Sequence, residues 1–219
     1  MSSPISTHRS WLTCSSGSPS NIASHPTGLS GLAKAVQGLQ LDKVGCIELD
    51  YATSSLGMID DTFLQRIYHA AQGLHFGAPS EAVANLLQKF RIYYPTADTI
   101  KGSIGGPDCA GIISLTKTHY SSASFPTECL RDHVSTRKGM LSHNKLLFAR
   151  GRHMDGKPFA WVYVGSANMS ESAWGAQKML KSGKLGKLTM RNWECGVVVP
   201  VPQEKVQAME LTEGEVPPM

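Results

Sequence analysis

The chain contains 219 residues, of which 41% are hydrophobic and 17% are charged. Because an average soluble protein has about 25% charged residues, this composition excludes a chain that is disordered throughout. The sequence has no run of the roughly 18–20 apolar residues that cross a bilayer, and its N-terminus lacks the basic-then-apolar profile of a secretory signal. We therefore expect a soluble, intracellular protein with no membrane partner, built from one large or two small domains.

The net charge of +4 says little about partners by itself, but the charge is unevenly distributed. Between Arg150 and Arg191 the sequence has eight cationic and two anionic residues. This concentration is consistent with a polyanionic partner and equally with a solvated basic loop.

The cysteines argue against a disulfide framework, because they are odd in number and widely spaced: Cys14, Cys46, Cys109, Cys129 and Cys195. They also offer no C-x-x-C pair for zinc. We expect reduced and mostly buried thiols.

The N-terminal part of the sequence predicts little regular structure. Residues 1–25 are rich in Ser, Pro and Gly and are expected to be irregular, with one candidate strand at residues 11–14. Apolar residues at helical spacing after Gly28 then predict a helix, and residues 44–49 read as a buried strand. Asp60 is a suitable cap for the next helix, which Gly73 would end.

The middle of the chain is harder to interpret. Residues 79–87 are expected to form a further helix and residues 90–94 a strand. Gly, Pro, Ser and Thr dominate residues 96–127, so we expect a long connection, followed by one short helix near residues 126–133.

The last third is rich in predicted strands, at residues 145–150, 159–164 and 195–199, where β-branched or aromatic runs are bounded by Gly and Pro. The acidic tail, residues 204–219, is expected to be peripheral. The main domain then covers residues 26–203, and the alternation of helices with strands indicates an α/β sandwich.

One segment carries chemistry. His143 and Lys145 lie two positions apart, so on a strand they would present an imidazole and an ammonium to the same side. A lysine stabilises the charge that spreads over phosphate oxygens during phosphoryl transfer, and a histidine moves protons or attacks phosphorus. Asn168, between a predicted strand and a helix start, would add a neutral donor at the same anion.

Each of these signals has a plainer interpretation. A lone H-x-K is common by chance, and Ser166 to Ser170 could simply cap a helix. Glu194 could cap the edge of a buried strand, and Trp174 is better explained as a packing anchor than as a base-stacking platform. Their joint order favours the functional interpretation.

That order resembles the C-terminal half of the type I tyrosyl-DNA phosphodiesterases, members of the phospholipase D superfamily. The resemblance rests on His143-Asn144-Lys145, on residues 161–175 and on residues 191–200, with weaker landmarks at Ser54-Ser55-Leu56-Gly57 and Tyr93-Tyr94-Pro95. It implies a phospholipase D-like half with a mixed β-sheet flanked by helices. Asn168 fits the family's replacement of the superfamily's usual aspartate.

The resemblance implies a DNA-repair phosphodiesterase that releases topoisomerase-derived tyrosine from a DNA 3′-phosphate without a metal ion or other cofactor. In this family a histidine of an N-terminal H-x-K motif attacks phosphorus, giving a phosphohistidine. His143 would be the second histidine, acting first as acid and then as base. Lys145 and Asn168 would hold the phosphate oxygens, and Glu194 would orient an imidazole.

The resemblance also implies a substrate partner, DNA 3′ ends carrying a tyrosyl or peptide adduct, and a nuclear location. Ser55, Ser166 and Ser170 fall where the family places groups near the DNA phosphates. The basic residues 178–187 could add sequence-independent attraction, or could only solubilise a loop.

The sequence departs from the family in one respect. It has a single H-x-K motif, so the expected nucleophile and the second pseudo-symmetric half are missing. The chain is then a fragment of a longer enzyme, pairs with a second copy, or is an inactive half that binds DNA ends or phosphate. A generic nuclease or phospholipase of the superfamily is a weaker alternative, because Asn168 replaces aspartate.

Overall fold

The computed structural model describes residues 10–13, 26–41, 44–75, 81–178, 180–184 and 186–208. Most of the predicted irregular segment 1–25, and residues 209–219 of the predicted acidic tail, lie outside these ranges. The strand expected near residue 11 is present as β1 (Ser10–Thr13).

The other strands are β2 (Val44–Ala52), β3 (Ser55–Leu56), β4 (Phe90–Tyr93), β5 (Ser114–Leu115), β6 (Leu130–Arg131), β7 (Lys145–His153), β8 (Pro158–Gly165) and β9 (Cys195–Pro200). The helices are α1 (Gly28–Gly38), α2 (Asp61–Ala71), α3 (Ala97–Lys101), α4 (Lys117–Tyr120), α5 (Glu171–Trp174) and α6 (Gln203–Ala208). Short 3₁₀ turns lie at η2 (Leu86–Lys89), η3 (Gly106–Ile112) and η4 (Thr127–Cys129).

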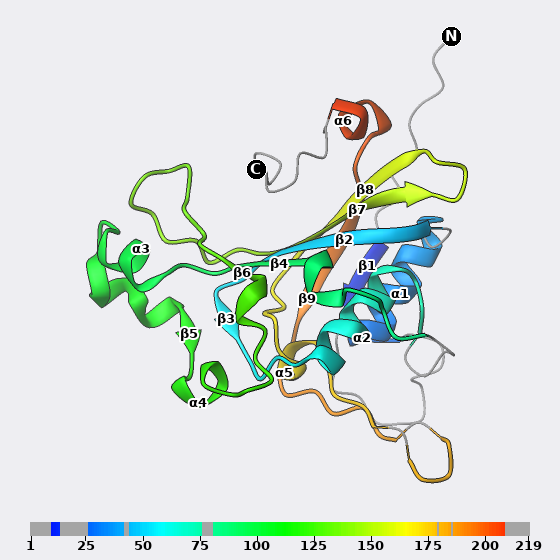
Figure 1. The fold of residues 1–219 in the computed structure, drawn as a ribbon, viewed down its shortest axis with the longest axis horizontal. Helices are drawn as coiled ribbons and strands as arrows, with labels where there is room; N and C mark the ends of the chain where they lie inside the picture. Colours follow the sequence, from blue (N-terminus) through cyan, green and yellow to red (C-terminus); the bar gives the residue numbers. More distant parts are fainter. Residues whose placement is uncertain are drawn as a thin grey trace.

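A mixed seven-stranded sheet in the order β1-β9-β8-β7-β2-β4-β6 forms the centre of the molecule (Figure 1). β2, β4 and β6 are parallel to one another. The pairs β2–β7, β7–β8, β8–β9 and β9–β1 are antiparallel. The expected mixed sheet flanked by helices is therefore confirmed.

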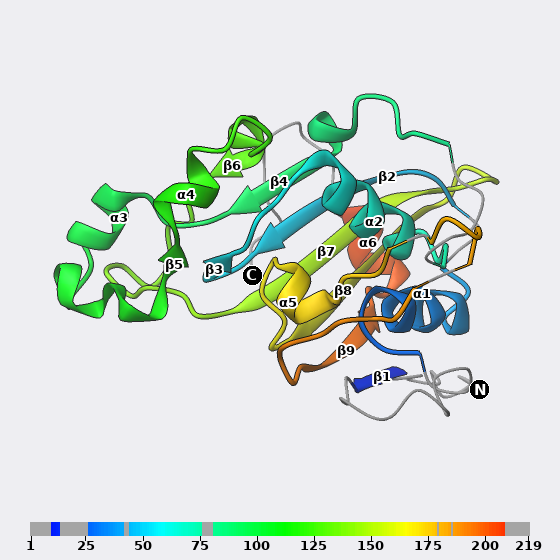
Figure 2. The same ribbon diagram turned by 90° about the horizontal axis from the view of Figure 1, so that it is seen from below.

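Helices α1, α2 and α5 lie on one face of the sheet, whereas α6 lies on the other (Figures 1 and 2). The core lies between the sheet and the first group of helices, where Leu32, Val36, Phe63 and Ile67 pack with the buried face of β8, including Trp161. These side chains explain the apolar helical periodicity of the sequence.

The opposite face of the sheet carries a network of ion pairs. Asp50, which is 1% exposed, contacts both Arg91 and Arg150. Glu48 lies 2.7 Å from the Arg91 guanidinium and 3.3 Å from that of Arg150. Arg150 is one of the cations in the basic stretch of the sequence, and these carboxylates neutralise its charge within the sheet.

Several predicted elements are confirmed. The helix expected after Gly28 is α1, and the helix capped by Asp60 is α2, in which the Asp60 carboxylate accepts a hydrogen bond from Phe63 N at 2.8 Å. The three strands expected in the last third are β7, β8 and β9.

The helix expected over residues 79–87 is wrong for the part that the structure describes. Residues 81–85 are not helical, and only the 3₁₀ turn η2 follows. Asn85 has a left-handed backbone (φ 52°), which ends any right-handed helix at that residue, and Glu81, Ala82 and Ala84 are exposed. Among residues 81–85 only Val83 packs against the core, so a helix there would bury little apolar surface and would have little stability.

The long connection over residues 96–127 contains more structure than expected. Thr96 and Thr116 each cap a short helix, because their hydroxyls accept hydrogen bonds from Thr99 N and His119 N. The helix expected near residue 126 is the 3₁₀ turn η4, followed by β6. Both views place α3 and α4 beyond the end of the sheet at which β2 ends (Figures 1 and 2).

The expectation of mostly buried thiols is also wrong. Of the cysteines that the structure describes with their side chains, Cys129 is buried and Cys46, Cys109 and Cys195 are exposed, all four as free thiols. Within the described ranges, no helix combines the length and the apolar character that crossing a membrane requires.

Candidate active site

The strand register brings four chain segments together at one end of the sheet, which we call the site end. Ala52, the last residue of β2, pairs with Leu146 on β7. Lys145 pairs with Gly165 at the end of β8, and Gly165 pairs with Gly196 near the start of β9. The segments that follow β2 and β8, and those that precede β7 and β9, therefore share this end.

The predicted catalytic residues lie in these segments. His143 and Lys145 stand at the start of β7, Asn168 follows β8, and Glu194 precedes β9. Thr53, which follows β2, and Asn168 are 115 positions apart in the sequence and also meet at this end.

The carboxamide of Asn168 is held by two buried hydroxyls. Thr53 Oγ1 lies 3.0 Å and Ser54 Oγ 3.2 Å from Asn168 Oδ1; Ser54 donates toward that oxygen, and Thr53 shares its single proton between that oxygen and Ser55 O at 3.0 Å. Within the described part of the chain, Asn168 Nδ2 makes no hydrogen bond. Because the acceptor end is occupied, the donor end is the one left for an anion.

The turn that carries Asn168 is fixed by two buried tyrosines. The Tyr51 hydroxyl donates to Ala167 O at 2.8 Å, and Ala167 N donates to the Tyr163 hydroxyl at 3.2 Å. Trp174 Nε1 in turn donates to the Tyr51 hydroxyl at 2.8 Å. Trp174 is 3% exposed, so it is a packing anchor, as expected. Its indole helps to hold Tyr51 against the turn.

Two glycines allow Tyr163 to reach this turn. A Cβ atom on Gly165 would lie 2.2 Å from the Tyr163 hydroxyl, and one on Gly196 would lie 2.1 Å from its ring. Any larger residue at either position would displace the ring that holds Ala167.

Lys145 and Glu194 are both buried and carry opposite charges, although their charged atoms lie beyond 4 Å of each other. Lys145 is 6% exposed and Glu194 9% exposed. The Lys145 ammonium donates to His143 O at 2.7 Å, which leaves two of its three protons for other acceptors. Burial lowers the pKa of Lys145, and the carboxylate of Glu194 opposes that shift. Glu194 is itself held by Asn192 Nδ2 at 2.9 Å.

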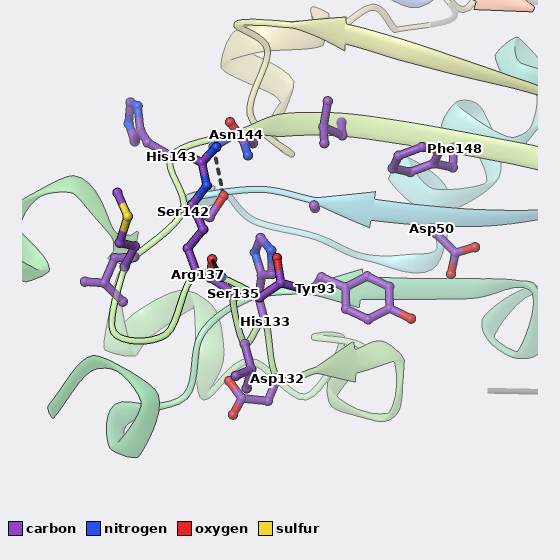
Figure 3. A pocket seen from close by; sticks show the side chains of 16 residues that line it. Asp50, Tyr93, Asp132, His133, Ser135, Arg137, Ser142, His143, Asn144 and Phe148 are labelled. Atoms are coloured by element: carbon purple, nitrogen blue, oxygen red, sulfur yellow. Dashed lines mark hydrogen bonds between the residues drawn. The ribbon is translucent and has the colours of Figure 1, made fainter. Parts of the chain in front are cut away.

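The His143 imidazole is exposed and makes no hydrogen bond to the described residues. Burial, and then the positive charge of Lys145, lower its pKa below the ordinary value. In Figure 3 the ring points away from His133 and Tyr93, which also line the cavity beside it. An unpaired, accessible imidazole next to an ammonium is free to exchange protons with a bound substrate.

A cavity of about 730 Å³ opens beside His143 (Figure 3). Its walls combine apolar and polar groups, among them Tyr93, His133, Arg137, Ser142, His143 and Phe148. Burial lowers the pKa of His133, although the neighbouring Asp132 carboxylate opposes that effect. This volume is typical of a small-molecule or side-chain pocket.

The three predicted substrate-binding serines lie near this end, and the hydroxyls of two of them have structural roles. Ser166 Oγ bonds to Cys195 O at 3.2 Å and accepts from Cys195 N at 2.9 Å. Ser170 caps α5 by accepting a hydrogen bond from Ala173 N. Ser55 begins β3 and is half-buried.

Sequence reasoning missed several residues at the site end. Thr53 and Ser54 hold Asn168, although Thr53 gave no signal beyond its position directly after a strand and Ser54 stood only in a weak family landmark. His133 and Arg137 line the cavity without belonging to any motif. Trp193, beside Glu194, is 70% exposed, and it stands out because Trp161 and Trp174 are buried.

Comparison with known proteins identifies the family and the fold. The family model for tyrosyl-DNA phosphodiesterase matches residues 8–216. A crystal structure of the yeast tyrosyl-DNA phosphodiesterase is similar with a TM-score of 0.57 and 19% identity, covering 87% of this chain and 45% of that chain. A histidine-to-asparagine mutant of the yeast protein gives a TM-score of 0.59 and 18% identity, covering 87% and 46%.

No curated protein sequence matches the chain. At 18–19% identity the solved structures show the fold, and this chain spans less than half the length of each of the two yeast chains. The expected resemblance to one half of the enzyme is consistent with that coverage. From the match of the family model over most of its length, the chain belongs to the tyrosyl-DNA phosphodiesterase family and has its phospholipase D-like fold.

Proposed function

We propose that this chain forms the general acid/base half of a tyrosyl-DNA phosphodiesterase that acts on DNA 3′ ends carrying a tyrosyl or peptide adduct. The observation that carries the proposal is that the segments holding His143, Lys145 and Asn168 share one end of the sheet, with the Asn168 carboxamide oxygen bonded to two hydroxyls so that its donor is free.

In this proposal the phosphate sits between Lys145 and Asn168. The Lys145 ammonium and Asn168 Nδ2 donate to non-bridging oxygens, whose charge grows in the transition state. Protonated His143 donates its proton to the departing phenolate oxygen, and the neutral imidazole later takes a proton from the attacking water. Glu194 keeps Lys145 positively charged despite burial.

The cavity beside His143 would receive the leaving group. Tyr93 and Phe148 offer aromatic walls for a tyrosyl ring, and its volume of about 730 Å³ leaves room for a few flanking peptide residues. His133 and Arg137 would face the polar backbone of such a peptide.

The nucleophilic histidine must come from a complementing half, either elsewhere in the same polypeptide, on a different chain or on a second copy. The single H-x-K motif of this sequence is the reason for this part of the proposal. A nuclear location belongs to the same proposal, since the substrate is damaged DNA.

A second function remains open, namely a catalytically inactive module that binds DNA ends. The observation that favours it is the same single H-x-K motif, together with a phosphate seat at Lys145 and Asn168 that needs no nucleophile in order to bind.

One experiment separates catalysis by a self-associated form from binding without catalysis. The chain alone, over a range of concentrations, is incubated in EDTA with a single-stranded oligonucleotide carrying a 3′-phosphotyrosine, and release of tyrosine is followed. His143→Ala is compared with His75→Ala, a matched change at an exposed histidine outside the site.

Cleavage that is lost in His143→Ala, kept in His75→Ala and rises more than linearly with protein concentration would support catalysis by a self-associated form. Salt-sensitive binding without cleavage at any concentration would exclude completion by a second copy, and would fit the module or a half that is completed by a different segment or chain. Neither binding nor cleavage would contradict both functions.

A further inference from the structure

A second group of reactive side chains lies at the opposite end of β2 from the candidate active site. At about 3.3 Å per residue, the strand places Cys46 roughly 20 Å from Thr53 at the site end. Two hydrogen-bond donors meet at its sulfur. The Lys89 ammonium donates to Cys46 Sγ, and the Tyr68 hydroxyl donates to the same atom at 3.7 Å.

The local backbone explains why these side chains lie close to the Cys46 sulfur. The pairing of β2 with β7 shifts register between Val44 and Ile47, so Cys46 lies outside the regular ladder. Ile47 N donates instead to the Tyr68 hydroxyl at 3.1 Å. Burial, above all, raises the pKa of Tyr68 to about 12, so this phenol stays protonated and remains a donor.

The sulfur is accessible to reagents. Cys46 is exposed, and it lines a cavity of about 430 Å³ together with Tyr68, His69, Glu81 and Lys89. A small oxidant or alkylating agent can therefore reach the thiol from solvent.

The chemistry follows from the two donors. A thiolate is a much stronger acceptor than a neutral thiol and is the nucleophilic form of cysteine, and here an ammonium and a phenol are both directed at one sulfur. Cys109 and Cys195 are also exposed, but no side chain among the described residues donates to their sulfurs. They are matched controls within the same chain.

We propose that Cys46 is a peroxide-reactive thiol whose oxidised sulfur is captured by the Lys89 amine as a sulfenamide. The thiolate attacks hydrogen peroxide, an S–O bond forms, the O–O bond breaks and hydroxide leaves, so that sulfur loses two electrons. Hydroxide takes a proton from the Lys89 ammonium. The free amine then attacks sulfur, an N–S bond forms, the S–O bond breaks, and water leaves.

The balance is one thiolate, one ammonium and one hydrogen peroxide giving one sulfenamide and two waters. The link would join β2 to the 3₁₀ turn that precedes β4, across 43 residues of sequence. Closing a loop of that length restricts the unfolded chain, so the oxidised protein should melt at a higher temperature than the reduced one.

Reactivity is tested by mass spectrometry of individual peptides after limiting iodoacetamide. We expect Cys46 to be alkylated at least about tenfold faster than Cys109 and Cys195. Lys89→Arg should keep this rate because a positive donor remains, whereas Lys89→Met should bring it down to that of the control cysteines.

Capture is tested by treating the protein with hydrogen peroxide. We expect a cross-linked peptide pair containing Cys46 and Lys89 that has lost two hydrogen atoms, is reversed by dithiothreitol and is absent in Cys46→Ser. Lys89→Arg should not form it, because a guanidinium is not nucleophilic. Equal alkylation of the three exposed cysteines, or oxidation of Cys46 without a link to Lys89, would overturn the proposal.

Discussion

The Thr53 hydroxyl and the Asn168 carboxamide oxygen lie 3.0 Å apart, although 115 residues separate them in the chain. This contact joins the end of β2 to the turn after β8. It fixes which end of the Asn168 amide faces the site, and that orientation makes the residue a donor toward an anion.

Changing Asn168 to Asp should weaken binding of an oligonucleotide with a 3′-phosphate. The change replaces the free donor by a negative oxygen, and a lost hydrogen bond to a charged group costs about 1.5–3 kcal/mol, or roughly tenfold or more in affinity. Fluorescence anisotropy measures the effect. Asn85→Asp, on an exposed turn, adds the same charge and is the control. An equal loss in both variants would assign the effect to net charge alone.

The His143 imidazole should titrate below its ordinary pKa, because burial and the Lys145 ammonium disfavour its charged form. The folded protein then binds this proton less tightly than the unfolded chain does. Its stabilising contribution is therefore present above the ordinary pKa and is lost as the pH falls through the window below it. Lys145→Met should raise the pKa, which NMR of the ring protons follows. An unchanged titration would mean that the two groups do not interact.

Removing the Tyr51 hydroxyl should destabilise the fold. Tyr51→Phe leaves the Ala167 carbonyl and the Trp174 indole N–H buried without a partner, at a cost of about 1–3 kcal/mol for each group. Urea denaturation measures the loss. Tyr120→Phe removes a half-exposed hydroxyl and should change the free energy of unfolding by less than about 0.5 kcal/mol. If both variants are equally stable, the turn does not depend on Tyr51.

The exposed indole of Trp193 should stack on a base of single-stranded DNA. Its backbone is anchored, because the amides of Arg191 and Asn192 both donate to Ser172 O, at 3.2 and 3.1 Å. Stacking on one base contributes about 1–3 kcal/mol, so Trp193→Ala should weaken oligonucleotide binding roughly tenfold, whereas Trp193→Phe should retain most of the affinity. Quenching of the exposed tryptophan on binding gives a second readout. Equal affinities for the two variants would exclude stacking.

Much of the fold can be predicted from the sequence, in the segments where a residue pattern fits only one kind of element. The run after Gly156 alternates large side chains with a period of two, and it is strand β8 with Trp161 and Tyr163 on the buried face. Asp60 directly before an apolar helical pattern is the cap of α2. In both cases burial and local hydrogen bonding agree.

The errors occur where burial is weak. The segment before η2 has helix-forming residues, but its side chains are exposed and Asn85 adopts a left-handed backbone. In the long connection, Thr96 and Thr116 cap helices of only one turn, which periodicity cannot detect.

The candidate active site could also be predicted only in part. His143, Lys145 and Asn168 could be named from motif order, and the strand register brings their segments together. The role of Thr53 and Ser54 could not be predicted, because it depends on which hydroxyl faces a residue in the turn after a distant strand. Sequence spacing carries no information on that choice.

The most direct test of the phosphate seat compares two oligonucleotides of one sequence, with a 3′-phosphotyrosine or a 3′-hydroxyl, by calorimetric titration at a fixed salt concentration. We expect the phosphotyrosyl end to bind at least about tenfold more tightly, and Lys145→Ala to abolish that difference while leaving the 3′-hydroxyl affinity unchanged. Equal affinity for the two ends, or a preference that survives Lys145→Ala, would contradict the account.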